Sequence, residues 1–185
     1  MWNIFHKSIN KIINPISGLG KRIFLIVSQL TPLCNVELVV KDSLDKTLLI
    51  YRDDEFYGPG WHLPGGVIRF RENVETRIYL TLLNELKIKK SFVSELKLIS
   101  CYEIINSKKI LRSHFISLLY YVKISKVNFK VPIYDNLMGY KNGDIAYHIR
   151  SPRNLLKEHL RYKEYIDDIS KAKDKLINKI KTVNL

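Results

Sequence analysis

The residue types best suited to chemistry gather in residues 61–88, which read WHLPGGVIRFRENVETRIYLTLLNELKI. Gly65 and Gly66 follow a strand-like run and precede a helical pattern, and such a turn lets the backbone approach a ligand closely. The turn can present carbonyl groups to a metal ion or amide groups to a phosphate. Glu85 stands on the otherwise apolar helical pattern, so its carboxylate is a candidate metal ligand. The stretch is therefore a candidate site for a metal ion or a phosphate, with Glu85 as the candidate metal ligand.

The elements that must position these residues are two pairs of strands and a helix between them. Strands are predicted at residues 34–41, 47–52, 96–105 and 114–124, with residues 106–109 connecting the last two. Residues 73–86 carry Val74, Ile78, Leu82 and Leu86 at steps of four, which predicts a helix with one apolar stripe packed on a sheet. Residues 34–150 therefore read as a mixed sheet with a covering helix.

Both ends of the chain read as helical. Residues 1–30 predict an amphipathic helix, a break at Pro15 and at residues 18–20, and a second helical segment that ends near Leu30. Ser151 and Pro152 form an N-cap and first-turn pattern, so residues 151–181 are predicted to be helical. This charged segment is expected to pack on its own domain, with membrane-surface or partner binding as the alternative.

The composition is that of an ordinary globular protein. The chain has 185 residues, 46% of them hydrophobic and 26% charged, which excludes disordered and collagen-like classes. Cys34 and Cys101 are too few for a zinc quartet or a disulfide framework. The longest early apolar run, residues 23–27, is too short to span a bilayer and no signal peptide is evident, so a cytoplasmic location is expected.

The net charge of +13 allows binding to nucleic acid, anionic membranes or phosphorylated small molecules. Most of the basic residues are lysines, and the chain is also rich in Ile and Asn. This combination is typical of an AT-rich coding sequence. The charge by itself therefore does not predict nucleic acid as a partner.

Residues 61–88 resemble the Nudix box, whose pattern is G-x5-E-x7-R-E-U-x-E-E-x-G-U with U apolar. Gly66, Glu72 and Glu85 match this pattern, together with apolar residues at two further positions. The box is degenerate, because its arginine, second glutamate, first paired glutamate and glycine are replaced by Leu80, Thr81, Asn84 and Lys87. The resemblance implies an α/β/α sandwich around a mixed sheet, with additional N- and C-terminal helices. The expected organisation is an N-terminal helical segment at 1–30, a Nudix domain at 31–165 and a C-terminal helical extension at 166–185.

The order of segments over residues 30–165 is similar to that of the GDP-mannose mannosyl hydrolase branch, whose box is also short of glutamates. This resemblance implies one Mg²⁺, held by the Gly65 carbonyl and Glu85. It implies that Arg52 binds the diphosphate and that Glu37 contacts the sugar nucleotide. The family's arginine after the two glycines is replaced by Val67.

The catalytic assignments follow from the same resemblance. His114 matches a family histidine near the leaving diphosphate, and Arg52 is assigned a catalytic role with it. The family's general-base histidine has no counterpart, and its aligned place falls near Asp144 in the polar loop 134–147. Asp144 is the leading candidate base and His148 the next, although a lone histidine such as His148 or His62 is more often structural.

Other charged residues near the box receive structural roles. Glu72 is expected to brace the start of the helix, where acidic residues are favoured. Arg77 is expected to be solvated, with replacement of the lost box arginine as the alternative. Arg69 and Arg71 are expected to lie on a solvated strand face.

The predicted function is Mg²⁺-dependent hydrolysis of a nucleotide-diphospho-sugar, GDP-mannose-like, that releases a nucleoside diphosphate (NDP) and free sugar by substitution at carbon. One alternative is pyrophosphatase chemistry on a nucleoside diphosphate derivative. The other is a catalytically impaired Nudix fold that binds a nucleotide or polynucleotide. A small-molecule nucleotide sugar is the expected partner and a homodimer is left open. Neither nucleic acid as a partner nor a transmembrane segment is expected. Weak contact of the charged segment 151–181 with a membrane surface is left open.

Overall fold

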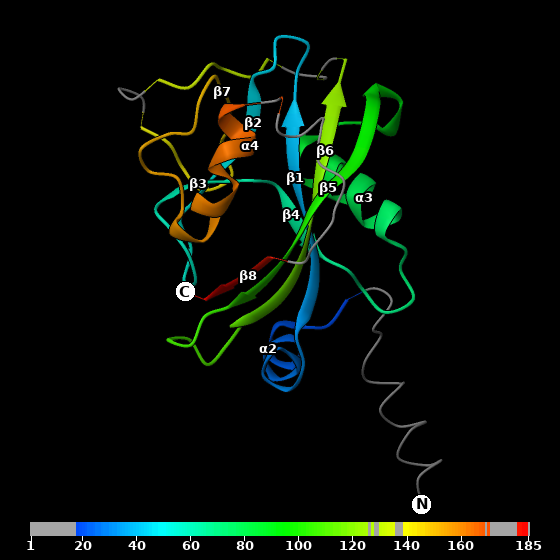
Figure 1. Cartoon of the computed structure of the whole chain (residues 1–185), viewed down its shortest axis with the longest axis vertical. Coiled ribbons are helices and arrows are strands. Elements are labelled where there is room, and N and C mark those ends of the chain that lie inside the picture. Colours follow the sequence, from blue (N-terminus) through cyan, green and yellow to red (C-terminus); the bar gives the residue numbers. More distant parts are fainter. Residues whose placement is uncertain are drawn as a thin grey trace, which may run out of the picture.

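The computed structural model describes residues 18–125, 127, 130–135, 139–168 and 170, and the backbone of 181–184. A sheet lies between two helical layers, and α2 (Lys21–Leu30) crosses its lower end (Figure 1). Helix α3 (Val74–Leu86) covers one face, and the 3₁₀ helix η2 (Lys157–Tyr162) with α4 (Lys163–Asp167) covers the other. The predicted α/β class and sandwich are therefore confirmed. The amphipathic helix predicted near the N-terminus falls on residues 1–17, outside the described residues.

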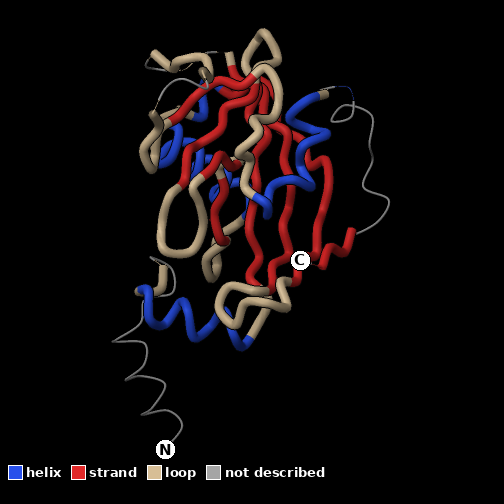
Figure 2. Tube along the Cα trace, turned by 90° about the vertical axis from the view of Figure 1, so that its left-hand side faces the viewer, coloured by secondary structure: helices blue, strands red, loops and turns tan. Residues whose placement is uncertain are grey.

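The sheet is mixed, and its strands run side by side in Figure 2. The strands are β1 (Leu33–Lys41), β2 (Thr47–Arg52), β3 (Gly60–His62), β4 (Gly65–Val67), β5 (Val93–Ile105), β6 (His114–Ile124), β7 (Ile145–His148) and β8 (Lys181–Asn184). Their order is β3-β2-β1-β6-β5-β8, with β4 paired to β1 and β7 paired to β2. Strand β1 is central: it is parallel to β6, and it is antiparallel to β2 near one end and to β4 nearer the other. The four strands predicted from the sequence are all present.

Alternation along β1 divides the core into two layers. Val36, Leu38 and Val40 are fully buried in the cluster that contains the α3 residues Ile78, Leu82 and Leu86. Val39 belongs to the opposite cluster, which η2 and α4 complete with Tyr162, Tyr165 and Ile166. Side chains alternate between the faces of a strand, so Glu37 shares the η2 face with Val39. This face of the sheet carries the pocket described below.

Helix α3 ends at Leu86 as predicted and begins at Val74, one residue after the predicted start, because Asn73 is its N-cap. Its N-cap Asn73 accepts a hydrogen bond from the Thr76 amide at 2.7 Å, and the apolar stripe faces the sheet. The helix ends at Leu86, and the C-cap residue Lys87 has φ +55° in the left-handed region. Glycine is favoured at that position of a helix C-terminus, so Lys87 adopts a backbone conformation that is more costly for it.

The predicted helix start at Ser151 and Pro152 is wrong. The Trp61 amide donates to the Asn154 carbonyl, and the Leu156 amide donates to the Trp61 carbonyl. These bonds place Leu155 in a parallel bridge with Trp61 of β3, and helical structure begins only at Lys157. Ser151 instead binds the Asp167 carboxylate through its amide and hydroxyl. Pairing with β3 therefore overrides the local capping signal.

The C-terminal segment also departs from prediction. Residues 181–184 form strand β8, parallel to β5, where a helical extension was predicted. The edge of β5 offers unpaired backbone groups that a strand can satisfy, and a local sequence pattern does not report such a partner. The predicted domain boundaries stay a prediction.

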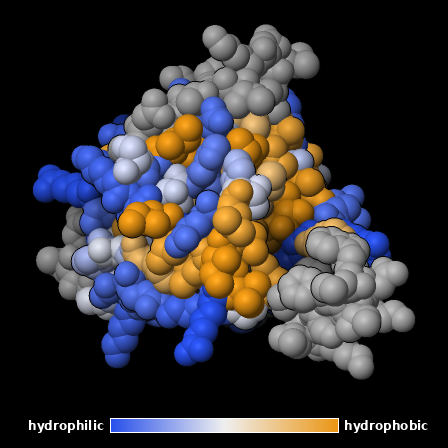
Figure 3. Space-filling view, turned by 90° about the horizontal axis from the view of Figure 1, so that it is seen from below, coloured by the Kyte–Doolittle hydropathy of each residue, from blue (hydrophilic) through white to orange (hydrophobic). Residues whose placement is uncertain are grey.

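The lower end of the molecule shows hydrophobic residues bordered by hydrophilic ones (Figure 3). Exposed contributors at this end include Ile26 and Leu30 of α2 and Ile110 of the β5–β6 connection. Within the described residues, no helix is long and apolar enough to cross a membrane.

Candidate active site

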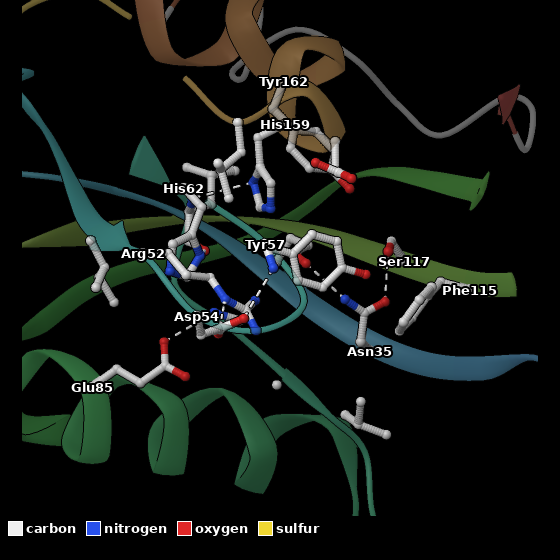
Figure 4. A pocket seen from close by; sticks show the side chains of 18 of the residues that line it. Asn35, Arg52, Asp54, Tyr57, His62, Glu85, Phe115, Ser117, His159 and Tyr162 are labelled. Carbon is white, nitrogen blue, oxygen red and sulfur yellow. Dashed lines mark hydrogen bonds and ion pairs between the residues drawn. The ribbon is translucent and has the colours of Figure 1, made fainter. Parts of the chain in front are cut away.

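A pocket of about 660 Å³ opens between the C-terminal end of α3, strand β4 and η2 (Figure 4). Four residues predicted for the site line it: Glu37, Arg52, Gly65 and Glu85. They come from β1, β2, β4 and α3, so the sheet order brings together residues that are separated in sequence. The cavity is within the range usual for small-molecule sites.

The β1–β4 pairing fixes the direction of the Gly65 backbone. The Leu38 amide donates to the Pro64 carbonyl, and the Ile68 amide donates to the Cys34 carbonyl. In this antiparallel register Gly65 faces Glu37 as a non-hydrogen-bonded pair. The Gly65 amide and carbonyl therefore point away from β1, and the amide donates to Glu85 Oε2 at 3.2 Å.

Both glycines are required by close approach. A Cβ atom on Gly65 would lie 2.7 Å from Glu37 Oε2 and 2.8 Å from the Val36 carbonyl oxygen. A Cβ atom on Gly66 would lie 2.9 Å from Thr81 Oγ1 on α3. These distances are below ordinary contact, so the two glycines let β4 pack between the Glu37 carboxylate and the helix.

The two carboxylates share a poorly solvated environment. Burial raises the pKa of Glu85 to about 7, against the lowering effect of the Gly65 amide. Burial, followed by repulsion from Glu85, raises the pKa of Glu37 well above its ordinary range. Glu37 Oε1 accepts a hydrogen bond from Asn35 at 2.8 Å, whereas Oε2 is buried without a partner. A buried carboxylate oxygen without a donor favours a bound cation or ligand donor at this place.

Arg52 stands at the end of β2 and lines the same pocket. Its Nε donates to Asp54 Oδ2 at 2.6 Å, and its guanidinium lies 4.6 Å from the centre of the Tyr57 ring. Its positive charge lowers the pKa of both Glu37 and Glu85, which places it near both carboxylates. The guanidinium can therefore offer charge-assisted hydrogen bonds to an anionic ligand in the pocket.

The structure does not bring the other predicted residues into the pocket. Phe115 and Ser117 of β6 line it, so alternation turns His114 to the other face, where its Nε2 lies 3.4 Å from Glu103. Asp144 is exposed, and its carboxylate accepts from the Lys141 amide at 2.7 Å. His148 is 1% exposed and lies against Trp61 and Tyr134, with ring centres 4.4 and 4.5 Å away.

Two other histidines, His62 and His159, line the pocket, and no local pattern in the sequence marks either of them as a pocket residue. His62 Nδ1 lies 2.7 Å from the Leu63 carbonyl, and the Leu63 amide donates to His159 Nδ1 at 3.2 Å. Burial, with a contribution from Arg52, lowers the pKa of His62 to about 4. Burial lowers the pKa of His159 well below its ordinary value. Both imidazoles are therefore neutral near pH 7.

Solved structures with similar folds are known. Neither a family model nor a curated protein matches the chain. A NUDIX hydrolase from Nitrosomonas europaea has TM-score 0.55 and 14% identity, over 84% of this chain and 80% of that one. A MutT protein from Methanosarcina mazei Go1 has TM-score 0.51 and 14% identity, over 74% of this chain and 94% of that one.

A third match is described as a possible asymmetric diadenosine tetraphosphate hydrolase from Jonesia denitrificans. Its TM-score is 0.50 and its identity 16%, over 75% of this chain and 99% of that one. The chain has the Nudix fold. Identities this low establish the fold alone and do not specify the reaction.

Within this Nudix fold, Glu72 and Arg77 form a buried brace between the β4–α3 loop and the helix. Arg77 donates from Nε and Nη2 to the two Glu72 oxygens, each at 2.8 Å, and the side chains are 8% and 10% exposed. The Arg69 amide also donates to Glu72. The prediction that Glu72 braces the helix start is confirmed. The expected solvation of Arg77 is wrong, because Arg77 packs beside Gly66 on the inner side of α3.

The strand predicted for Arg69 and Arg71 is also wrong. Strand β4 ends at Val67, and Arg71 has φ +59° in a turn. Pairing with β1 extends only to Val67 opposite Asn35, so the following residues have no partner strand in the sheet.

Proposed function

We propose that this chain hydrolyses a nucleoside diphosphate-linked sugar, GDP-mannose-like, by attack of water at the sugar carbon. The observation that carries the proposal is the convergence of Glu85, Glu37, the Gly65 backbone and Arg52 on one pocket. Carboxylates and a carbonyl suit a hard divalent cation, and a guanidinium suits a diphosphate. A nucleotide joined to a sugar by a diphosphate contains the chemical groups that this set can bind.

The residues fit one magnesium ion. Among the described residues, no group of three or more His, Cys, Asp or Glu side chains is arranged to hold a metal. Glu85 and the Gly65 carbonyl are the proposed ligands, and the unpartnered Glu37 Oε2 is a third oxygen beside Gly65. When bound, the ion would offset negative charge on the departing diphosphate.

The degenerate box favours substitution at carbon over attack at phosphorus. Thr81 is buried against Gly66, and Asn84 is neutral at the pocket wall, so neither position supplies another carboxylate. Attack at phosphorus in Nudix enzymes typically uses more carboxylates to gather several ions. In the proposed step a water oxygen bonds to the sugar carbon while the bond from that carbon to the diphosphate oxygen breaks, and NDP leaves.

His62 is the residue that we propose accepts the proton of the attacking water. Its Nδ1 faces the Leu63 carbonyl, so Nδ1 carries the ring proton and Nε2 is left as the acceptor. His62 lines the pocket together with Arg52 and Glu85 (Figure 4). This assignment replaces Asp144, whose carboxylate caps the Lys141 amide instead.

The experiment is hydrolysis of GDP-mannose with Mg²⁺ in ¹⁸O-labelled water, followed by mass spectrometry of both products. Label in the free sugar, with unlabelled GDP, is the expected result. Label in a phosphate group would show attack at phosphorus and support the pyrophosphatase alternative. GDP binding without hydrolysis of GDP-linked sugars would contradict the enzyme assignment and support a binding protein.

A further inference from the structure

Three positively charged side chains surround one aromatic ring at an edge of the pocket. The Lys109 Nζ, Arg52 Cζ and Arg112 Cζ atoms lie 4.0, 4.6 and 5.4 Å from the centre of the Tyr57 ring. Arg52 ends β2, Tyr57 lies in the loop after it, and the other two come from the β5–β6 connection. We call Arg52, Tyr57, Lys109 and Arg112 the Tyr57 cluster. Of these, Arg52, Tyr57 and Arg112 line the pocket.

The carboxylates around the Tyr57 cluster do not balance its positive charge. Asp54 pairs with Arg52 at 2.6 Å, and Glu158 lies 3.4 Å from Lys109. Among the described residues, no carboxylate forms an ion pair with Arg112. The cluster therefore carries one more positive charge than its paired carboxylates provide.

Aromatic rings hold the Arg112 guanidinium in place without neutralising it. Its Cζ lies 5.6 Å from the Phe24 ring centre and 5.2 Å from that of Phe56, and its Nε is buried without a hydrogen-bond partner. The Arg112 amide donates to Ser28 Oγ of α2 at 3.1 Å, which fixes the backbone. A partly desolvated, positioned guanidinium with an unused donor is suited to an oxyanion.

We propose that the Arg112 side of the pocket is a second anion subsite, which takes a phosphoryl group carried by the substrate in addition to the diphosphate. A phosphomonoester carries a charge of about −1.5 to −2 near neutral pH, which suits several converging cations better than a singly charged carboxylate. Arg52 lies between this subsite and the two carboxylates, since its charge acts on Glu37, Glu85 and Arg112. The substrate class would then be a nucleoside diphosphate derivative with an extra phosphate. The proposal rests on the proposed function for the placement of the diphosphate.

The experiment measures binding of inorganic phosphate by ³¹P NMR titration of the full chain, with and without saturating GDP. Phosphate is expected to bind in both conditions with a dissociation constant that changes less than about threefold, because GDP occupies the neighbouring diphosphate position. Arg112→Gln should weaken phosphate binding about tenfold or more, which corresponds to one charge-assisted hydrogen-bond pair. Lys109→Gln should weaken it in the same direction and provides a second variant within the Tyr57 cluster.

Arg150→Gln is the matched control, because Arg150 is exposed and does not line the pocket. Its phosphate affinity should equal that of the parent chain. Competition between GDP and phosphate would overturn the second subsite and assign Arg112 to the diphosphate position itself. Equal phosphate affinity in the parent and in both cluster variants would also overturn it. The phosphate titration measures binding and does not require hydrolysis of a substrate. Failure of the proposed hydrolysis would therefore be a separate result.

Discussion

His62 and His159 are held in opposite tautomers by the two sides of one residue, Leu63. The Leu63 carbonyl accepts a hydrogen bond from His62 Nδ1 at 2.7 Å, while the Leu63 amide donates to His159 Nδ1 at 3.2 Å. His62 Nε2 is therefore an acceptor, and His159 Nε2 carries a proton. The ring centres lie 5.5 Å apart, so the pocket has one imidazole suited to accept a proton beside one suited to donate a hydrogen bond.

The first prediction is that His62→Gln lowers the hydrolysis rate by about a hundredfold or more, the contribution of a positioned general base. Glutamine keeps a polar side chain but cannot accept the proton. GDP affinity, measured by calorimetry, should hardly change, since His62 is not assigned to the diphosphate. Asp144→Asn is the comparison variant and should keep the parent rate. A large loss of hydrolysis rate in Asp144→Asn, with little loss in His62→Gln, would show that the general base lies in the 134–147 loop and is not His62.

The second prediction concerns the magnesium ligands. Glu85→Gln should abolish Mg²⁺-stimulated turnover, because glutamine carries no negative charge for the ion. The fold should stay intact, because the glutamine side-chain oxygen can still accept the hydrogen bond from the Gly65 amide. The measurement is initial rate against Mg²⁺ concentration, with circular dichroism as the check on folding. Glu75→Gln, an exposed change on the same helix, is the control. Parent-like Mg²⁺ dependence in Glu85→Gln would show that the metal assignment is wrong.

The third prediction concerns the diphosphate. Arg52→Ala should weaken GDP binding about tenfold or more, because one charge-assisted contact contributes on the order of 1.5–3 kcal/mol. Isothermal titration calorimetry gives the dissociation constant directly. Arg71→Ala removes an exposed arginine outside the pocket and should bind GDP like the parent chain. An unchanged constant in Arg52→Ala would exclude Arg52 from the diphosphate site.

The fourth prediction concerns stability in acid. Burial lowers the pKa of His148 from 6.5 to about 4, so the folded state disfavours its protonation while the unfolded state takes up the proton. The stabilisation from neutral His148 is therefore complete above pH 6.5 and is lost as the pH falls toward 4. The loss approaches about 1.4 kcal/mol per pH unit.

His148→Phe should remove this loss, because phenylalanine can keep the packing on Trp61 and Tyr134 and has no buried ring nitrogens. Urea denaturation between pH 7 and pH 4.5 should show the variant gaining stability relative to the parent as the pH falls. Parallel stability curves would mean that His148 is protonated equally easily in both states.

The fifth prediction concerns the brace between Glu72 and Arg77. Arg77→Met should lower the free energy of unfolding by about 3–5 kcal/mol, because it leaves the buried Glu72 carboxylate without its guanidinium partner. The control is Lys90→Met, which breaks an exposed pair with Glu75 whose side chains are 68% and 60% exposed. That change should lower the free energy of unfolding far less, because water already solvates both charges of an exposed pair. Similar losses in the two variants would show that burial does not strengthen the inner pair.

The elements that the sequence predicts well are those set by short periodic patterns. The four-residue spacing of Ile78, Leu82 and Leu86 gives one apolar stripe, and an amphipathic helix buries such a stripe wherever the sheet lies. Likewise, β2 and β6 have the boundaries predicted for them, since β-rich runs and turn residues are local features. The resemblance to the Nudix box also placed Gly65 and Glu85 together, and the structure joins them by a hydrogen bond.

Which side chains reach the pocket depends on contacts between elements that are distant in the sequence. His114 follows the pocket-lining Ser113 and precedes Phe115, but strand alternation turns it to the opposite face. His159 reaches Leu63 only because residues 154–156 pair with Trp61 and set the position of η2. Such pairing joins backbone groups that are distant in the sequence. Local periodicity and capping patterns therefore do not predict it. Local patterns were therefore enough to predict four of the strands and helix α3, and the resemblance to the Nudix box was enough to pair Gly65 with Glu85, whereas non-local backbone pairing sets which histidines face them.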